Sequence, residues 1–397
     1  MPELHHIFDQ SSALPRKRAG VFVGRLEVPG VGPHLVAVEG HELVDITAAG
    51  PTMSDLLDAE VPAAAVREAA GSSTTRWDLA EVLGATLEQA AADAGPPTRP
   101  LLLAPFDLSA LKAAGVTFAK SMVERVIEEH AEGDPKAARA LREKLGGSIE
   151  QAVAVTPGSP EAEEIKQRLI QEGLWSQYLE VGIGPDPEIF TKAQPLSGVG
   201  LGARIGVLER SVWNNPEPEV VLACSSSGRA VGATLGNDVN LRDFEGRSAL
   251  LLTEAKDNNA SCSAGPFIRL FDEGFTLEDL RDSEVHLEIR GEDGFVLNAV
   301  SSVSEMSRTF EELIGHAYGS HHQYPDGFAL FTGTMFAPTE DRDVEGEGFT
   351  HHEGDHVLIS SEELGTLANT VTTAEAAPDW TFGARALMRN LAGRGLL

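Results

Sequence analysis

Apolar and polar positions divide the 397-residue chain into segments with different periodicities. Short apolar runs separated by glycines, which are typical of strands, occupy residues 19–45. An alanine-rich, mostly helical pattern covers residues 60–94. Residues 95–100 contain three prolines and a glycine and form the clearest linker signal in the chain. We therefore expect an N-terminal α/β domain over residues 1–97 and a second domain over residues 98–397.

The second domain is expected to be β-rich, with one long helical interruption. A buried strand is predicted at residues 101–105, and strands and turns alternate again in the C-terminal third. Between them, residues 121–175 have a polar helical pattern, in which Ser159 and Pro160 supply an N-cap and a first-turn proline. The chain thus predicts an α+β fold with a helical insertion. This insertion is either structural padding or a lid beside a functional site.

The main candidate for chemistry is a predicted hairpin that carries three acidic residues. Glu217 and Glu219 are two residues apart, so an extended strand would point both carboxylates to the same side. A strand, a turn and a returning strand are predicted over residues 219–235, and they would bring Asp238 back beside the glutamates. Converging carboxylates repel one another unless a cation lies between them, and their oxygens suit Mg2+, Ca2+ or Mn2+. Judged on the E-x-E alone, the solvated face of an edge strand is the favoured explanation of the two glutamates, because charges on strands are usually exposed.

Composition narrows the functional classes. The net charge of -30 argues against general nucleic-acid binding, which needs a basic surface. The sequence has no signal-peptide pattern at its polar start and no apolar run long enough to span a membrane. Two cysteines, Cys224 and Cys262, in a chain of this length indicate a reducing compartment. We expect a cytoplasmic protein that binds neither nucleic acid nor membrane.

Taken together and in this order, the motifs resemble the fumarylacetoacetate hydrolase superfamily over about residues 101–371. The motifs that carry the resemblance are the E-x-E of Glu217 and Glu219, the N-D-x-x-x-R-D of residues 237–243, Lys256, Gly265-Pro266, the T-G-T of residues 332–334, Gly354-Asp355 and the segment 364–371. The resemblance implies a mixed β-roll-like catalytic domain and a homodimer or homotetramer. It also implies a divalent metal, Mg2+ or Mn2+, bound by Glu217, Glu219 and Asp238.

One departure from the family pattern bears on the reaction. Hydrolases of the family carry G-x-N-Y-x-x-H, whose histidine activates water. The aligned residues 115–121 have Thr117, Phe118 and Ser121 at the positions of the asparagine, tyrosine and histidine. A serine is no general base near neutral pH without a base beside it. The chain is therefore more similar to the 2-keto-3-deoxy sugar acid dehydratases of the superfamily, which share the long helical insertion.

Two other functions stay open at this stage. An acylpyruvate- or fumarylacetoacetate-type hydrolase would need a histidine from elsewhere, such as His130 in the insertion. A non-catalytic binding homologue is disfavoured because the E-x-E, Asp238 and Lys256 are all present. Product analysis separates dehydration, which gives one semialdehyde, from hydrolysis, which gives two acids.

The resemblance implies a metal-dependent dehydration of a small 2-keto acid, in which a 2-keto-3-deoxypentonate gives 2,5-dioxopentanoate during sugar-acid catabolism. The metal stabilises the enolate that forms when a C3 proton leaves. We expect Lys256 to move the proton or stabilise the enolate, with a pKa lowered by the metal and by burial. A Schiff base to the keto group is a less favoured role for this lysine. The structural alternative is an ion pair of Lys256 with Asp243 or Asp257.

The remaining site residues are assigned by the same resemblance. Ser121 is expected to help the C4 hydroxyl leave, and Thr334 to hold the substrate carboxylate. Phe118 and Arg242 complete the expected substrate-binding set.

Overall fold

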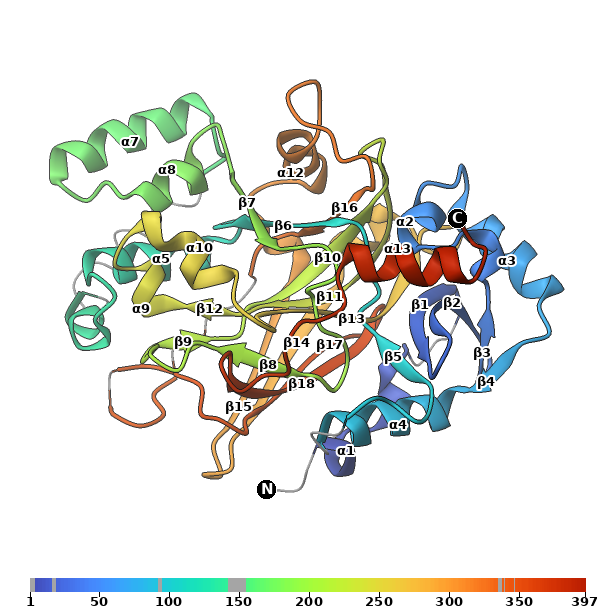
Figure 1. The fold of residues 1–397 in the computed structure, drawn as a ribbon. Coiled ribbons are helices and arrows are strands. Elements are labelled where there is room, and N and C mark those ends of the chain that lie inside the picture. Colours follow the sequence, from blue (N-terminus) through green and yellow to red (C-terminus); the bar gives the residue numbers. More distant parts are fainter. Residues whose placement is uncertain are drawn as a thin grey trace.

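The computed structural model describes residues 4–15, 19–91, 95–141, 155–334, 338, 340–345 and 347–397. Its main element is an eleven-stranded sheet that runs through the molecule (Figure 1). In spatial order the strands are β4 (Arg76–Asp78), β3 (Glu42–Asp45), β2 (Gly32–Glu39), β1 (Val21–Val28), β13 (Cys262–Leu270), β11 (Ala230–Asp238), β10 (Pro218–Cys224), β16 (Phe328–Phe331), β6 (Ala110–Gly115) and β7 (Glu188–Ala193), with β5 (Leu101–Leu103) paired to β1. All strand pairs in this large sheet are antiparallel except β16 with β6.

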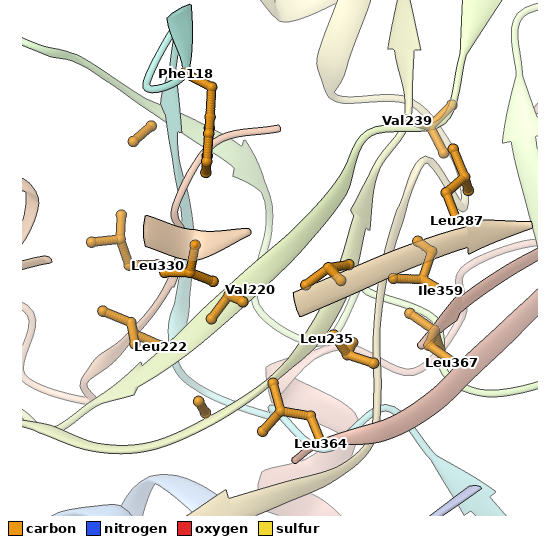
Figure 2. Packing of buried hydrophobic residues seen from close by; sticks show 14 of the residues in the cluster. Phe118, Val220, Leu222, Leu235, Val239, Leu287, Leu330, Ile359, Leu364 and Leu367 are labelled. Atoms are coloured by element: carbon orange, nitrogen blue, oxygen red, sulfur yellow. The ribbon is translucent and has the colours of Figure 1, made fainter. Parts of the chain in front are cut away.

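A five-stranded sheet packs against the central strands of the large sheet. Its order is β15 (Val296–Ser302), β14 (Glu284–Arg290), β17 (His356–Ser361), β18 (Gly365–Thr373) and β8 (Arg204–Val207), and a two-stranded ribbon of β9 (Asn214–Asn215) and β12 (Asn240–Leu241) lies apart from both sheets. Figure 2 shows the core between the sheets, where Leu235 of the hairpin lies close to Ile359 and Leu367. Each of these side chains is at most 1% exposed, so this core fixes the hairpin firmly.

Helices cover the ends of the large sheet. Those in the described part of the chain are α1 (Leu4–Ile7), α2 (Met53–Leu57), α3 (Pro62–Ser72), α4 (Leu79–Ala91), α5 (Ala119–His130), α7 (Pro160–Glu172), α8 (Gln177–Ile183), α9 (Arg242–Glu245), α10 (Leu252–Lys256), α11 (Leu277–Arg281), α12 (Phe310–Ala317) and α13 (Ala384–Gly393). Short 3-10 turns are η1 (Gln10–Ala13), η2 (Thr47–Ala49), η3 (Ala249–Leu251) and η4 (Val303–Glu305). No helix among the described residues combines the length and the apolar character that crossing a membrane requires.

The N-terminal strands and the catalytic strands share one sheet. Phe22 of β1 lies opposite Arg269 of β13, so the sheet continues across the linker at residues 95–100. The α/β character expected for residues 1–97 is present in β1–β4 and α1–α4. The boundary between residues 97 and 98 stays a prediction, since strands from both sides of it are hydrogen-bonded to each other.

The expected helical insertion is present between β6 and β7, at the end of the molecule remote from the N-terminal strands (Figure 1). The predicted cap is confirmed, because Ser159 Oγ accepts from Ala162 N and Pro160 is the first helical residue. The helices enclose an apolar core of their own, in which Met122 and Ile127 of α5 are fully buried. Residues 142–154, which belong to the predicted insertion, lie outside the described residues.

The predicted acidic hairpin is confirmed as β10 and β11. Glu219 lies opposite Gly236 in the register, and Asp238 N donates a 3.0 Å hydrogen bond to Glu217 O. β10 lies between β11 and β16 rather than at an edge of the sheet. The exposed edge-strand interpretation of Glu217 and Glu219 is therefore wrong.

Gly236 gives a direct test of this packing. A Cβ on Gly236 would overlap the rings and methyls of Phe331 and Val221, so Gly236→Ala should destabilise the fold by about 1–3 kcal/mol. A Cβ on Gly71 of α3 would have no atom within 4 Å, so Gly71→Ala should be neutral or stabilise by up to about 1 kcal/mol. Urea unfolding of both variants measures the difference. Equal stability of the two variants would contradict the packing described here.

Candidate metal and catalytic site

Three buried carboxylates meet at the open end of the β10–β11 hairpin. Glu217, Glu219 and Asp238 are 3%, 1% and 1% exposed, and each offers an oxygen within 4.8 Å of the other two. Glu217 and Glu219 flank Pro218 at the start of β10, and Asp238 ends β11. The fold thus brings together the three carboxylates expected from the sequence, and it does so through the expected β-hairpin. Such a group of hard oxygen donors could hold a divalent metal ion.

The backbone around Glu219 is shaped to receive its carboxylate. Gly333 N donates a 2.8 Å hydrogen bond to Glu219 Oε2. Gly333 has a φ of +99°, and a Cβ there would overlap Thr117 Oγ1. Glycine is therefore required at this position of the T-G-T motif, because only glycine fits both the conformation and the space.

Cations on neighbouring strands and helices balance part of the negative charge. Lys256 Nζ lies 2.5 Å from Glu217 Oε2 and 3.3 Å from Asp238 Oδ2. Lys192 Nζ lies 2.9 Å from Asp238 Oδ1, and Arg125 Nη2 contacts Glu217 Oε1. These three cations leave Glu219 without an ion pair among the described residues. A bound metal would therefore stabilise the charged form of Glu219 more than that of the two paired carboxylates.

The pKa values of the three carboxyl groups reflect this uneven pairing. Burial, and then the charges of Asp238 and Glu217, raise the pKa of Glu219 well above its usual range. Burial also raises the pKa of Glu217, although Lys256 and Arg125 act in the opposite direction. Burial acts on Asp238 too, but Lys192 and Lys256 outweigh it and hold the pKa of Asp238 below its usual range. A divalent cation would favour the charged form of all three groups.

Before a metal binds, the surrounding carboxylates shift the pKa of Lys256 upward, opposite to the direction expected with a bound metal. Burial acts to lower that pKa, but the charges of Asp238 and Glu217 outweigh burial and raise it. Lys256 is therefore held as a cation. The alternative partners are also not used: Asp243 accepts hydrogen bonds from Ser211 and Val212, and Asp257 accepts one from Gln194.

The carboxylates border a small cavity of about 10 Å3, the space of roughly one water molecule. Of the expected site residues, Ser121 and Thr334 line it together with Lys256 and the three carboxylates. The other lining residues are Ala114, Gly115, Val116, Arg125, Glu188, Phe190 and Glu245. Ser121 Oγ donates to Phe118 O at 2.9 Å, so its hydroxyl is held in place at the start of α5.

Phe118, Arg242 and His130 are not among the residues that line this cavity. Phe118 belongs to the hydrophobic core between the sheets, where Figure 2 shows its ring. Arg242 is fully buried in ion pairs with Glu128 and stacks 4.4 Å from the centroid of the Trp213 ring. His130 Nδ1 lies 2.8 Å from Val126 O at the end of α5. None of these three side chains is therefore among the described contacts of Glu217, Glu219 and Asp238.

Sequence reasoning missed several residues that meet the carboxylates or line the cavity, among them Glu188, Phe190, Lys192, Arg125 and Glu245. Glu188, Phe190 and Lys192 alternate along β7, so all three side chains point to one face of that strand, toward the site. Arg125 follows Ser121 by one helical turn, which puts both on the same face of α5. These spacings were visible in the sequence, but only the assembled fold shows which face they share with the hairpin.

Among the described residues, five buried acidic side chains and four buried basic ones form this cluster. They are Glu128, Glu217, Glu219, Asp238 and Glu245, with Arg125, Lys192, Arg242 and Lys256. Glu188 is half-buried and borders the same cavity.

Comparison with known proteins identifies the hairpin segment. Residues 217–372 match the family model described as fumarylacetoacetate (FAA) hydrolase C-terminal. This segment is similar to the C-terminal domain of fumarylacetoacetate hydrolases. The resemblance inferred from the motifs is thereby confirmed over these residues.

Two curated relatives of the domain are similar in sequence. A protein of Haloferax volcanii described as "Probable 2-keto-3-deoxyxylonate dehydratase" is 35% identical over 196 residues, which are 49% of this chain and 64% of that protein. A 2-dehydro-3-deoxy-D-arabinonate dehydratase of Saccharolobus solfataricus is 33% identical over 185 residues, 47% of this chain and 58% of that protein. The aligned part of the chain covers less than two thirds of each relative.

Solved structures share the fold. A 2-keto-3-deoxy-D-arabinonate dehydratase complexed with magnesium and 2,5-dioxopentanoate has a TM-score of 0.60 and 21% identity, over 89% of this chain and 99% of that one. The apo form of a 2-keto-3-deoxy-D-arabinonate dehydratase has a TM-score of 0.59 and 22% identity over the same shares. The expected β-rich fumarylacetoacetate-hydrolase-like fold is confirmed.

Glu219→Gln gives a selective test of the metal site. Glutamine can still accept from Gly333 N and breaks no ion pair, so the fold should survive. Loss of a direct carboxylate ligand should weaken Mn2+ binding by at least about 100-fold, more than an outer-shell change does. Calorimetric titration with Mn2+ measures this affinity, with Glu375→Gln on the exposed surface as the control. Unchanged binding in Glu219→Gln would exclude this carboxylate as a ligand.

Proposed function

We propose that this protein is a metal-dependent hydro-lyase that removes water from a 2-keto-3-deoxy sugar acid. The substrate class that fits best is a 2-keto-3-deoxypentonate, which would give 2,5-dioxopentanoate. The observation that carries the proposal is a cavity in which the three carboxylates meet Lys256 and Glu188, with no histidine among its lining residues. The relatives described as dehydratases support the same reaction.

The donor set fits Mg2+ or Mn2+, and one structural neighbour is described as a complex with magnesium. A divalent cation on Glu217, Glu219 and Asp238 would polarise the 2-keto group of a bound 2-keto acid and acidify its C3 protons. Lys192 forms an ion pair with Asp238, and Gly333 N–H donates a hydrogen bond to Glu219. The protein's part is thus to keep three ligand oxygens fixed at one end of the cavity.

Lys256 is proposed to stabilise the enolate rather than to act as a base. Its ammonium lies at the cavity wall, paired with Glu217 and Asp238, and these two carboxylates favour its charged form. A fixed positive charge there favours negative charge that develops on the substrate's C2 oxygen. The sequence had left proton transfer and enolate stabilisation open for this lysine, and the ion pairs support the second role.

Glu188 is proposed as the group that moves protons. Burial, followed by the charge of Glu245, raises the pKa of Glu188 to about 7, where a carboxyl can both accept and donate a proton near neutral pH. It lines the cavity beside Gly115, where a Cβ would overlap the Glu188 carboxylate. Gly115 is therefore needed to let this side chain approach the site.

With these groups, every proton and the leaving hydroxyl of the proposed reaction are accounted for. The C3–H bond breaks and its proton goes to the Glu188 carboxylate, and the C4–O bond breaks as the leaving hydroxyl takes a proton from the same group to form water. Ser121 is proposed to hydrogen-bond the leaving hydroxyl, and Thr334 the substrate carboxylate. Transfer of a C5 proton to C3 then gives an enol, which converts to the aldehyde of 2,5-dioxopentanoate. The net change is the loss of one water molecule.

The cavity is too small for a five-carbon acid in the state described, since it holds about one water. Ser121 and Arg125 of α5 form part of its wall. We propose that the insertion opens to admit substrate and closes over it, as a lid does. A small-molecule 2-keto acid is the proposed partner of the site, and a homodimer or homotetramer stays a prediction of the family resemblance.

Product analysis tests the proposed reaction. With Mg2+, a 2-keto-3-deoxypentonate should give 2,5-dioxopentanoate, while an acylpyruvate given side by side should remain intact. Chelation should abolish turnover and Mg2+ should restore it. Cleavage of the acylpyruvate without 2,5-dioxopentanoate from any deoxy acid would overturn the assignment, and full turnover after exhaustive metal removal would exclude metal dependence.

Three substitutions test the proposed roles. Glu188→Gln should lower turnover by about 10²-fold or more, the scale of general acid–base catalysis, with Mn2+ affinity retained. Lys256→Met should lower turnover by a similar factor, because the developing charge loses its fixed counter-charge. Ser121→Ala should reduce turnover less than either. Glu188→Gln with wild-type turnover would exclude this carboxyl as the proton carrier.

A further inference from the structure

Arg125 is a buried cation that contacts a metal-ligand candidate from the insertion. It lies on α5, is 5% exposed, and its Nη2 contacts Glu217 Oε1. Its Nη1 donates a 2.6 Å hydrogen bond to Glu128 Oε2 and lies 3.4 Å from Glu245 Oε2. One guanidinium thus bridges three carboxylates on three different elements, which the planar fork of arginine allows.

The contacts continue from Glu128 into the body of the protein. Glu128 Oε1 accepts from Arg242 Nε at 2.7 Å, and Arg242 stacks on Trp213 and donates to Pro338 O at 2.9 Å. Glu128, Arg242 and the Arg125 guanidinium are buried, so these charge-assisted hydrogen bonds are shielded from solvent. The insertion is therefore joined to the hairpin by a continuous chain of buried ion pairs, not only by apolar packing.

We propose that Arg125 is a positioning residue that couples the helical insertion to the metal site. It holds Glu217 in the orientation that binds the cation, and the same contact fixes α5 at the cavity wall. The inference rests on the proposed metal site and goes further, since it assigns the insertion a part in metal binding. Outer partners that orient a ligating carboxylate are known to contribute to metal affinity.

Arg125 could instead compete with the cation, because both are positive and both approach Glu217. The geometry favours orientation. Arg125 and Lys256 occupy opposite oxygens of Glu217, and each carboxylate oxygen has a second lone pair that a metal can use. The guanidinium is also held by Glu128 and Glu245, so its charge is already balanced before a metal arrives. Competition predicts tighter metal binding when the arginine contact is weakened, and orientation predicts weaker binding.

Arg125→Lys separates the two effects, because lysine keeps the charge but cannot bridge three carboxylates. We expect Mn2+ to bind this variant about 10-fold more weakly than the wild type, measured by calorimetric titration. Hydrogen exchange should show added protection of residues 119–130 on Mn2+ binding in the wild type, and no added protection in Arg125→Lys. Equal or tighter Mn2+ binding in the variant would overturn the proposal.

Arg308→Lys is the matched control, because it should destabilise the insertion without changing a contact of Glu217, Glu219 or Asp238. Arg308 is 3% exposed and its Nη2 donates to Val181 O and Gly184 O at the end of α8. This variant should lose protection in α8 and keep the wild-type Mn2+ affinity. An equal loss of affinity in Arg308→Lys would mean that any loosening of the insertion weakens binding, which would overturn the specific role of Arg125.

Glu128→Gln provides a second measurement if Arg125→Lys fails to fold. It weakens the hold on Arg125 without contacting Glu217, so Mn2+ affinity should fall in the same direction by a smaller factor. Unchanged affinity in a folded Glu128→Gln would contradict the coupling. The wild-type titration separates this inference from the proposed site: absence of Mn2+ binding in the wild type sinks both, whereas binding that Arg125→Lys leaves unchanged sinks only the inference.

Discussion

Three carboxylates within 4.8 Å of one another, away from water, are the constraint on which the rest of the site depends. Burying an ionised carboxylate is costly unless it is paired and hydrogen-bonded. The protein meets this cost with Lys256 and Lys192, with a guanidinium from the insertion, and with one backbone N–H. The buried carboxyls still outnumber the buried cations, and Glu219 accepts a backbone hydrogen bond but has no ion pair among the described residues.

The fold explains how such a cluster stays in place. The hairpin lies in the middle of the large sheet, between β13 and β16, and its apolar side chains pack into the core between the sheets (Figure 2). The chain enters the insertion through Val116, a β-branched residue with a φ of +57° that also lines the cavity. A positive φ is rare for valine and persists only where the surroundings over-determine it. The sheet thus holds the three carboxylates in place, and Arg125 of the insertion contacts one of them, Glu217.

The sequence predicted the parts of the site that depend on local pattern. The spacing of Glu217 and Glu219 and the turn that follows were enough to place Asp238 beside them, because hairpin geometry is local. The Ser159 and Pro160 cap was predictable for the same reason. The assignment to the family was predictable because the motifs occur in a fixed order, although each motif is short.

What the sequence could not give depends on contacts between distant elements. The raised pKa of Lys256 follows from Glu217 and Asp238, which lie 39 and 18 positions earlier in the chain. The motif suggested Arg242 as a substrate ligand, but the fold turns it toward Glu128 and Trp213. Glu188 and Lys192 belong to no motif that the sequence analysis used. Their side of β7 faces the hairpin only because β7 pairs with β6 at the end of the large sheet. Side-chain partners across elements are set by tertiary packing, which local spacing does not encode.

That the buried carboxylates form a divalent-metal site can be tested directly by a crystal structure of the protein with Mn2+, measured at a wavelength where manganese scatters anomalously. We expect one strong anomalous peak per chain, at about 2.0–2.3 Å from oxygens of Glu217, Glu219 and Asp238. A fully occupied manganese peak elsewhere, with none among these three carboxylates, would contradict the assignment of the metal site.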